Sequence, residues 1–286
     1  MITSRRNPLV RRLKALVTRR GREEQQLLLL EGTHLLQEAL SCRQLSGQIA
    51  SAPALELVAT REWLDRHPEL LDRLPAETVL HQVSPEVLSA ALTTVNPDGV
   101  ATLLPLAALP PPVSGATLLL ALDRLQDPGN LGSLFRSSLA AGVDGLWMAS
   151  GADPLAPKVL RSSAGSVLHL PYQRFGPSEQ DGVAQLAAKL QEAAIQGMQV
   201  VATLVPDAAG IDATPPYWEL DWRQPTVLVL GNEGAGIHPS LQACCTHGVT
   251  LPHSPAVESL NVAAAAVPLL LERRRVKMTA PLQQSG

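Results

Sequence analysis

The sequence is poor in cysteine, and its cysteines lack the spacing that disulfide frameworks and zinc sites require. Only three occur in 286 residues: Cys42 and the adjacent pair Cys244 and Cys245. No Cys-x-x-Cys pair is present, and two neighbouring cysteines with His247 nearby do not make a zinc ligand set. Sparse cysteine is typical of a reducing compartment, so we expect a cytoplasmic protein without a bound metal.

Long apolar runs and a dinucleotide fingerprint are also missing. The longest apolar stretch, residues 262–271, is too short to span a bilayer and contains Pro268. The arginine-rich start is not followed by the apolar stretch of an export signal. A Gly-x-Gly-x-x-Gly turn with an acid about 20 residues later is absent, which argues against a nicotinamide or flavin oxidoreductase.

Acidic residues are absent from the first 22 positions, although the whole chain has a net charge of -3. The basic residues of this leader are Arg5, Arg6, Arg11, Arg12, Lys14, Arg19, Arg20 and Arg22. A basic leader on an acidic body favours contact with phosphate groups. A solvated surface helix or a frayed terminus is the alternative.

A Pro-rich stretch at residues 105–115 divides the chain, because its prolines interrupt regular hydrogen bonding and leave a stiff linker. Residues 1–104 alternate helical and short apolar patterns, which predicts a small α/β domain. The expected helices lie near 8–17, 33–40, 61–71 and 84–92, and the expected strands near 26–30, 55–59 and 78–80.

A second α/β domain with a mostly parallel sheet is expected over residues 116–275, followed by a flexible tail at 276–286. Its predicted strands lie at 117–122, 145–149, 199–205, 226–230 and 248–251. Three short blocks of small and polar residues follow or precede these runs, at 127–132 with Arg136, at 231–236 and at 259–263. The ends of strands are where α/β proteins build ligand sites, so we expect the blocks to meet.

The order and spacing of the three blocks resemble the SpoU (TrmH-like) branch of the SPOUT methyltransferases. This resemblance implies methyl transfer from S-adenosylmethionine to a ribose 2′-hydroxyl of RNA, a trefoil knot, and a homodimer formed through the knot and the final helix. The run at residues 94–100 resembles the ribosomal-protein-like substrate-binding domain of that family, which favours ribosomal RNA as substrate. Transfer RNA, or a catalytically silent RNA-binding protein, remains an alternative.

The resemblance also implies roles for particular residues. Those implied in catalysis are Arg136, Asn130, Glu233, Ser259 and Asn261. Those implied in cofactor binding are Gly231, Leu251, Leu260, Thr203 and Gly236. Those implied in RNA binding are Arg5, Arg6, Arg11, Arg12, Lys158 and Arg161. An arginine is a poor proton acceptor, so we expect Arg136 to orient phosphate and stabilise a developing alkoxide.

Each of these residues also has an ordinary structural interpretation. Ser259 precedes an apolar helical pattern and is predicted to be its N-cap. For Asn130 the alternative is a helix cap, and for Glu233 it is a solvated loop acid. The glycines of the second block suit a tight turn. Lys158 and Arg161 fit a charged helix face as well as an RNA contact.

Overall fold

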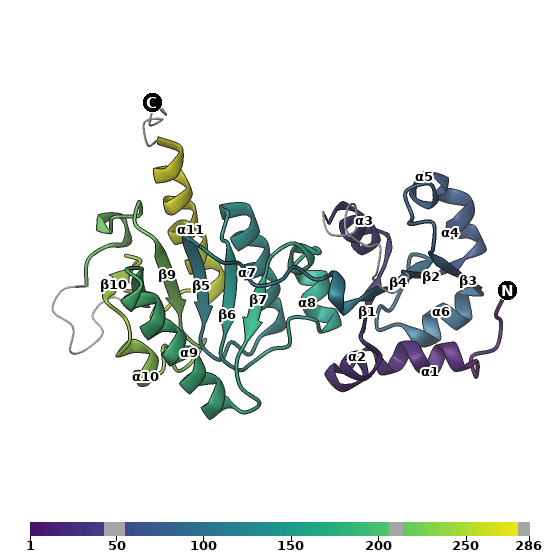
Figure 1. The fold of residues 1–286 in the computed structure, drawn as a ribbon, viewed down its shortest axis with the longest axis horizontal. Coiled ribbons are helices and arrows are strands. Elements are labelled where there is room, and N and C mark those ends of the chain that lie inside the picture. Colours follow the sequence, from purple (N-terminus) through teal and green to yellow (C-terminus); the bar gives the residue numbers. More distant parts are fainter. Residues whose placement is uncertain (43–54, 206–213, 280–286) are drawn as a thin grey trace. The chain divides into compact units, whose positions relative to one another are not determined.

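The computed structural model describes residues 1–42, 55–205 and 214–279, and the chain forms two compact units (Figure 1). One unit contains Met1–Pro110 together with Asp153–His169, and the other contains Pro111–Ala152 and Leu170–Gly286. The tail was predicted to be flexible from residue 276, but residues 276–279 belong to the final helix, Val262–Thr279, and the tail lies outside the described residues from position 280 onward. Among the described residues, no helix is both long and apolar enough to cross a membrane.

The N-terminal unit is built on a four-stranded mixed sheet with the order β1-β4-β2-β3. Its strands are β1 (Leu27–Glu31), β2 (Glu56–Thr60), β3 (Val79–Val83) and β4 (Val100–Pro105). β4 is antiparallel to β1 and β2, and β2 is parallel to β3. Its helical segments are α1 (Pro8–Ala15), α2 (Arg19–Gln25), α3 (Thr33–Ser41), α4 (Arg61–Arg66), α5 (Pro68–Leu71), α6 (Pro85–Ala91), η1 (Leu106–Ala108), α8 (Pro157–Ser162) and η2 (Ser166–Leu168).

Helices cover both faces of this sheet because successive strand residues point to opposite sides. Val58 packs with Leu13 of α1 and Leu88 of α6 in one apolar cluster. Its neighbour Leu57 packs with Trp63 of α4 in another. The leader is therefore not frayed: α1 and α2 are regular helices, and α1 begins where the Asn7 side chain accepts a hydrogen bond from the Leu9 amide.

Two features of this unit differ from the sequence prediction. Strand β4 was not expected, and Pro105, predicted to open the linker, is its last residue and lies opposite Leu27 of β1. The segment Asp153–His169, expected within the methyltransferase domain, packs with the N-terminal unit. There Arg161 Nη1 donates to Glu31 Oε2 at 3.4 Å, and His169 Nε2 lies 2.9 Å from Glu38 Oε2.

The C-terminal unit contains a six-stranded parallel sheet with the order β10-β8-β9-β5-β6-β7. Its strands are β5 (Leu118–Leu122), β6 (Gly145–Met148), β7 (Tyr172–Arg174), β8 (Gln199–Leu204), β9 (Thr226–Leu230) and β10 (His247–Thr250). Its helices are α7 (Pro128–Ala141), α9 (Glu179–Ile195), α10 (Pro239–Gln242) and α11 (Val262–Thr279), with the short turn η3 (Tyr217–Glu219).

Helices on both faces bury the sheet. Residues of α9 and α10, among them Leu186 and Leu241, pack against Val227 and Val229 of β9, whereas α7 and α11 pack against each other on the opposite face (Figure 1). Burial on both faces explains why β5 and β9 are continuous apolar runs. The prediction of a parallel α/β sheet is confirmed.

Cys244 and Cys245 follow α10, as expected for helix-end packing. Both lie against the apolar cluster beneath α9 and α10. Burial raises the pKa of the Cys245 thiol to about 12, so the thiol stays protonated near neutral pH.

Candidate active site

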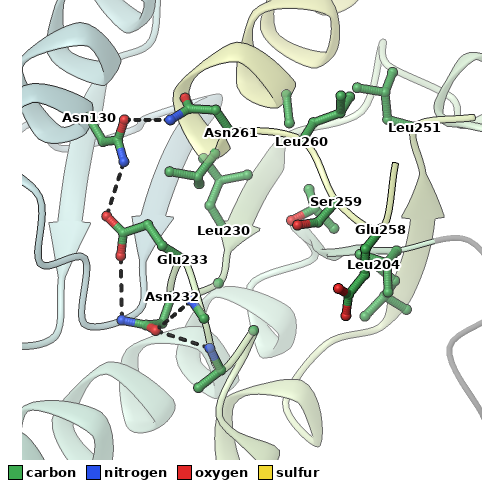
Figure 2. A pocket seen from close by; sticks show the side chains of 18 of the residues that line it. Asn130, Leu204, Leu230, Asn232, Glu233, Leu251, Glu258, Ser259, Leu260 and Asn261 are labelled. Atoms are coloured by element: carbon green, nitrogen blue, oxygen red, sulfur yellow. Dashed lines mark hydrogen bonds between the residues drawn. The ribbon is translucent and has the colours of Figure 1, made fainter. Parts of the chain in front are cut away.

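A pocket of about 600 Å³ lies at the carboxyl ends of β8, β9 and β10, where the loops after these strands meet the start of α7 and α11 (Figure 2). The predicted residues that line it are Asn130, Thr203, Gly231, Glu233, Gly236, Leu251, Ser259, Leu260 and Asn261. All three sequence blocks therefore contribute to one cavity. Arg136 is the only predicted catalytic residue that does not line it.

A chain of hydrogen bonds joins one residue from each block. Asn261 Nδ2 donates to Asn130 Oδ1 at 2.8 Å, and Asn130 Nδ2 donates to Glu233 Oε1 at 3.2 Å (Figure 2). The Glu233 carboxylate also accepts from the backbone amides of Gln126 and Asp127. Glu233 is therefore not a free loop acid, because it ties the second block to the first.

Asn232 shapes the glycine-rich loop from within. Its Oδ1 accepts hydrogen bonds from the amides of Gly234 and Ala235, at 3.0 and 3.1 Å, and its Nδ2 donates to the Arg124 carbonyl oxygen at 2.9 Å. The side chain of Asn232 therefore supplies a hydrogen-bond acceptor to two backbone amides inside the loop.

Glycine is required at two positions of this loop for different reasons. A Cβ at position 231 would lie 2.5 Å from the carbonyl carbon of Gly236, which is closer than atoms can approach. Gly236 has a φ of +66°, in the left-handed region that other residues rarely adopt. The loop after β9 can therefore fold back closely only with these residues.

The start of α11 differs from the prediction. Ser259 does not cap the helix, because α11 begins at Val262 and Asn261 is the residue immediately before it. Asn261 Oδ1 accepts from the amides of Ala263 and Ala264, at 3.0 and 3.2 Å. Ser259 instead lies on the pocket wall. Asn261 thus combines a helix cap with the contact to Asn130.

Sequence reasoning assigned no role to Asp123, which is fully buried at the end of β5. It accepts hydrogen bonds from Arg124 Nε at 2.7 Å and from the His238 amide at 2.6 Å. This pairing raises the pKa of the Arg124 guanidinium above its usual value. The sequence did contain a signal for this residue, because Asp123 is an acid that directly follows the apolar run of β5.

The cavity has an apolar wall and a polar rim. Leu204, Leu230, Leu251 and Leu260 supply much of the apolar surface. The Thr203 hydroxyl donates to the Val229 carbonyl oxygen at 2.8 Å, so Thr203 shapes the wall and its proton is already engaged. Such a pocket suits a ligand with a flat apolar portion and a few polar groups that backbone atoms can bind.

The profile of the SpoU rRNA Methylase family matches residues 117–270, which contain all three blocks and the pocket. The chain belongs to this family. The profile of the MRM3-like substrate binding domain matches residues 7–102 of the same SpoU methylase.

Two relatives of this SpoU methylase match it along nearly its whole length. A protein of Synechocystis sp. named "Uncharacterized tRNA/rRNA methyltransferase" is 43% identical over 284 residues, covering 98% of this chain and 95% of the relative. The 23S rRNA (guanosine(2553)-2′-O)-methyltransferase RlmP of Bacillus subtilis is 29% identical over 274 residues, covering 96% and 98%.

Solved structures agree with this assignment of the SpoU methylase. The AdoMet-bound rRNA methyltransferase from Sinorhizobium meliloti has a TM-score of 0.76 at 29% identity, covering 96% of this chain and 97% of that one. The SpoU methyltransferase AviRb from Streptomyces viridochromogenes, in complex with AdoMet, has a TM-score of 0.73 at 28% identity, covering 95% and 99%.

Arg136 of the SpoU methylase is exposed on α7. Within the described part of the chain its side chain makes no hydrogen bond or ion pair. Six positions along a helix turn by roughly 600°, which leaves Asn130 and Arg136 about 120° apart around the axis. The two side chains therefore do not share one face of α7, and the Arg136 guanidinium remains available to a partner molecule.

The basic residues predicted to bind RNA differ in their surroundings. Arg12 forms a two-point ion pair with Glu56, at 2.7 and 2.6 Å, and Arg161 is bonded to Glu31 and Thr93. Arg22 of the leader is buried and pairs with Asp153. Arg5, Arg6 and Arg11 are exposed. Much of the positive charge of the leader is thus already balanced by acids beyond it.

Proposed function

We propose that this SpoU methylase transfers a methyl group from S-adenosylmethionine to a ribose 2′-hydroxyl of ribosomal RNA. The observation that carries this proposal is the single pocket in which all three blocks meet. The similarity to RlmP along nearly the whole chain supports ribosomal RNA over transfer RNA. The AdoMet complexes of two structural relatives support the cofactor.

The residues around the pocket fit S-adenosylmethionine. The glycine at position 231 lets the loop backbone itself form part of the pocket wall, and Leu251 and Leu260 offer the apolar surface that an adenine needs. Thr203 and Gly236 complete this wall. When bound, the cofactor supplies a methyl group on a sulfonium, which is already a good leaving group.

The catalytic roles follow from the hydrogen bonds of the site. Asn261 and Asn130 hold Glu233 and fix the edge of the pocket, and Ser259 borders the same space. In our proposal Arg136 acts from the RNA side, where its protonated guanidinium binds phosphate and stabilises charge that develops on the ribose oxygen. Holding the hydroxyl and the methyl donor in line is the main contribution of such a site.

We also propose that the two domains have different functions. Residues 1–104 bind the RNA substrate, and Arg5, Arg6 and Arg11 are the exposed RNA contacts of the leader. Further RNA contacts are Arg12, Lys158 and Arg161. The match of residues 7–102 to a substrate-binding domain supports this assignment. Residues 116–275 carry out methyl transfer, with Asp153–His169 of this range packed in the N-terminal unit.

Three further properties belong to the same proposal: a trefoil knot that brings the second and third blocks together, a homodimer formed through the knot and α11, and a cytoplasmic location. Leu271 of α11 is 46% exposed and Leu139 of α7 is 38% exposed, so these packed helices leave apolar surface uncovered. Light scattering on the purified protein tests the dimer. The scarcity of cysteine supports a reducing compartment.

The activity is tested by incubating the purified protein with S-adenosylmethionine and, in separate reactions, ribosomal RNA or transfer RNA from cells that lack the protein, and then mapping 2′-O-methylation. We expect methylation in ribosomal RNA and none in transfer RNA. Binding of NADH in place of S-adenosylmethionine, or RNA binding without any methyl transfer, would contradict the proposal.

A further inference from the structure

A second pocket, of about 250 Å³, lies in the N-terminal unit at the end of β1. Its walls come from Glu31, the first turn of α3, the loop at residues 92–98 and Arg161 of α8. Among the described residues, none lines both this pocket and the candidate active site. The methyl-transfer chemistry leaves it without a role.

One wall of the second pocket is held by a buried carboxylate. The Glu31 side chain is only 3% exposed, and it accepts hydrogen bonds from the amides of Thr93 and Thr94 at 2.9 and 2.8 Å. Both threonine hydroxyls and Arg161 Nη1 also donate to it. A carboxylate with five donors fixes the start of the loop, so the pocket is preformed.

The opposite wall is fixed at α3. Asp98 Oδ2 accepts a hydrogen bond from the Thr33 amide at 2.7 Å, which joins the end of the loop to the helix. Gly32, with a φ of +100°, allows the chain to turn between β1 and α3. The second oxygen of Asp98 has no donor among the described residues.

Two polar side chains between these walls have no partner in the described structure. Asn96 and His34 are exposed, line the pocket, and make no side-chain hydrogen bond to any described residue. Val95, beside Asn96, is 89% exposed. An amide, an imidazole and a carboxylate oxygen together offer both donors and acceptors to a ligand.

The charges around the pocket limit the class of ligand. Glu31 and Asp98 bring two carboxylates, and Arg161 is the only guanidinium among the lining residues. Such a pocket does not favour a phosphate group or another anion. It favours a neutral group with several hydrogen-bonding positions on one edge, which describes a nucleobase.

We propose that this pocket binds one unpaired base of the RNA substrate, with Asn96, His34 and Asp98 hydrogen-bonding its edge. This inference rests on the proposed function for the RNA class. Proteins that read RNA sequence target unpaired bases, because duplex RNA hides the base edges in a deep, narrow groove. The pocket thereby contributes to the choice of RNA, and none of its lining residues belongs to the methyl-transfer site.

The test uses the full-length protein with ribosomal RNA from cells that lack it. Asn96→Ala and His34→Ala should each raise the Michaelis constant for RNA about tenfold, the effect of losing one or two hydrogen bonds. The turnover number and the calorimetric affinity for S-adenosylmethionine should stay unchanged. Gln37→Ala, an exposed change one turn further along α3, is the matched control and should have no effect.

Direct RNA binding separates this inference from the proposed function. A pool of single-stranded oligoribonucleotides should compete with ribosomal RNA for binding to the wild-type protein, whereas duplex RNA of the same length should not. In Asn96→Ala and His34→Ala the single-stranded pool should compete no better than the duplex. Methylation by the wild type with equal Michaelis constants in Asn96→Ala, His34→Ala and Gln37→Ala would overturn the base pocket and leave methyl transfer intact. RNA binding that depends on Asn96 and His34 without any methylation would support the pocket and overturn the proposed function.

Discussion

Asn261 uses both ends of its side-chain amide, and substitution can separate the two contacts. Its Oδ1 caps α11 through the amides of Ala263 and Ala264, and its Nδ2 donates to Asn130. Aspartate keeps the acceptor and loses the donor, whereas alanine loses both. Asn261→Asp should therefore damage only the active site, and Asn261→Ala should damage the site and the helix.

The expected magnitudes follow from these contacts. Loss of an N-cap costs about 1 kcal/mol, which lowers the melting temperature of a protein of this size by roughly 2–4 °C. Aspartate keeps the cap and adds a favourable charge at the helix start, so its melting temperature should match or exceed the wild type. Both variants lose the bond to Asn130, which should slow methyl transfer by about tenfold.

Thermal melting and initial rates of methyl transfer, measured on the same preparations, check this prediction. Asn7→Ala is a matched control, because Asn7 caps α1 through the Leu9 amide and lies outside the active site. It should lower the melting temperature without changing the rate per folded molecule. Full activity in Asn261→Asp would refute the role of the bond to Asn130, and an unchanged melting temperature in Asn261→Ala would refute the cap.

Gly231→Ala should abolish calorimetric binding of S-adenosylmethionine, because the new Cβ would lie 2.5 Å from the Gly236 carbonyl carbon; near-normal affinity would mean that the loop can open without loss. Arg136→Ala should leave melting and cofactor affinity unchanged and slow methyl transfer about 100-fold, and retained turnover would move the catalytic role elsewhere. The pKa of Glu56 is lowered mainly by its hydrogen bond to Arg12, so its stabilising effect should be present above the unfolded pKa and lost as pH falls through the folded one. Melting curves of Glu56→Gln should accordingly show a smaller loss of stability than the wild type as pH falls below about 4.5, the ordinary pKa of a glutamate, and identical acid profiles would contradict the contribution of this pair.

The sequence predicted most strands of the parallel sheet because a strand buried on both faces must be apolar throughout. β5 and β9 are such runs. β7 was missed, since Tyr172–Arg174 is short and only partly buried and gives no apolar signal. β4 was missed because Pro105 suggested a break, although a proline at the last position of a strand disturbs little of the ladder.

The sequence blocks located the pocket, but they could not decide the finer roles. Ser259 and Asn261 are both good N-cap residues, and only the point at which the chain becomes helical selects between them. The direction of Arg136 likewise depends on the angle around α7. The partners of the basic leader lie far along the chain, as with Arg12 and Glu56, so charge counting alone overstated its exposed charge.

The placement of Asp153–His169 limits how freely this protein can be divided or recombined. The chain passes between its two units at three junctions, after residues 110, 152 and 169. A fragment cut only at the Pro-rich stretch would carry the fully or almost fully buried Val159 and Leu160 away from β1, which they accompany in the intact unit. An exchange of RNA specificity between relatives would therefore need to move this internal segment together with Met1–Pro110. Each folded unit combines two separate segments of the chain, so a single cut in the gene cannot separate one unit from the other.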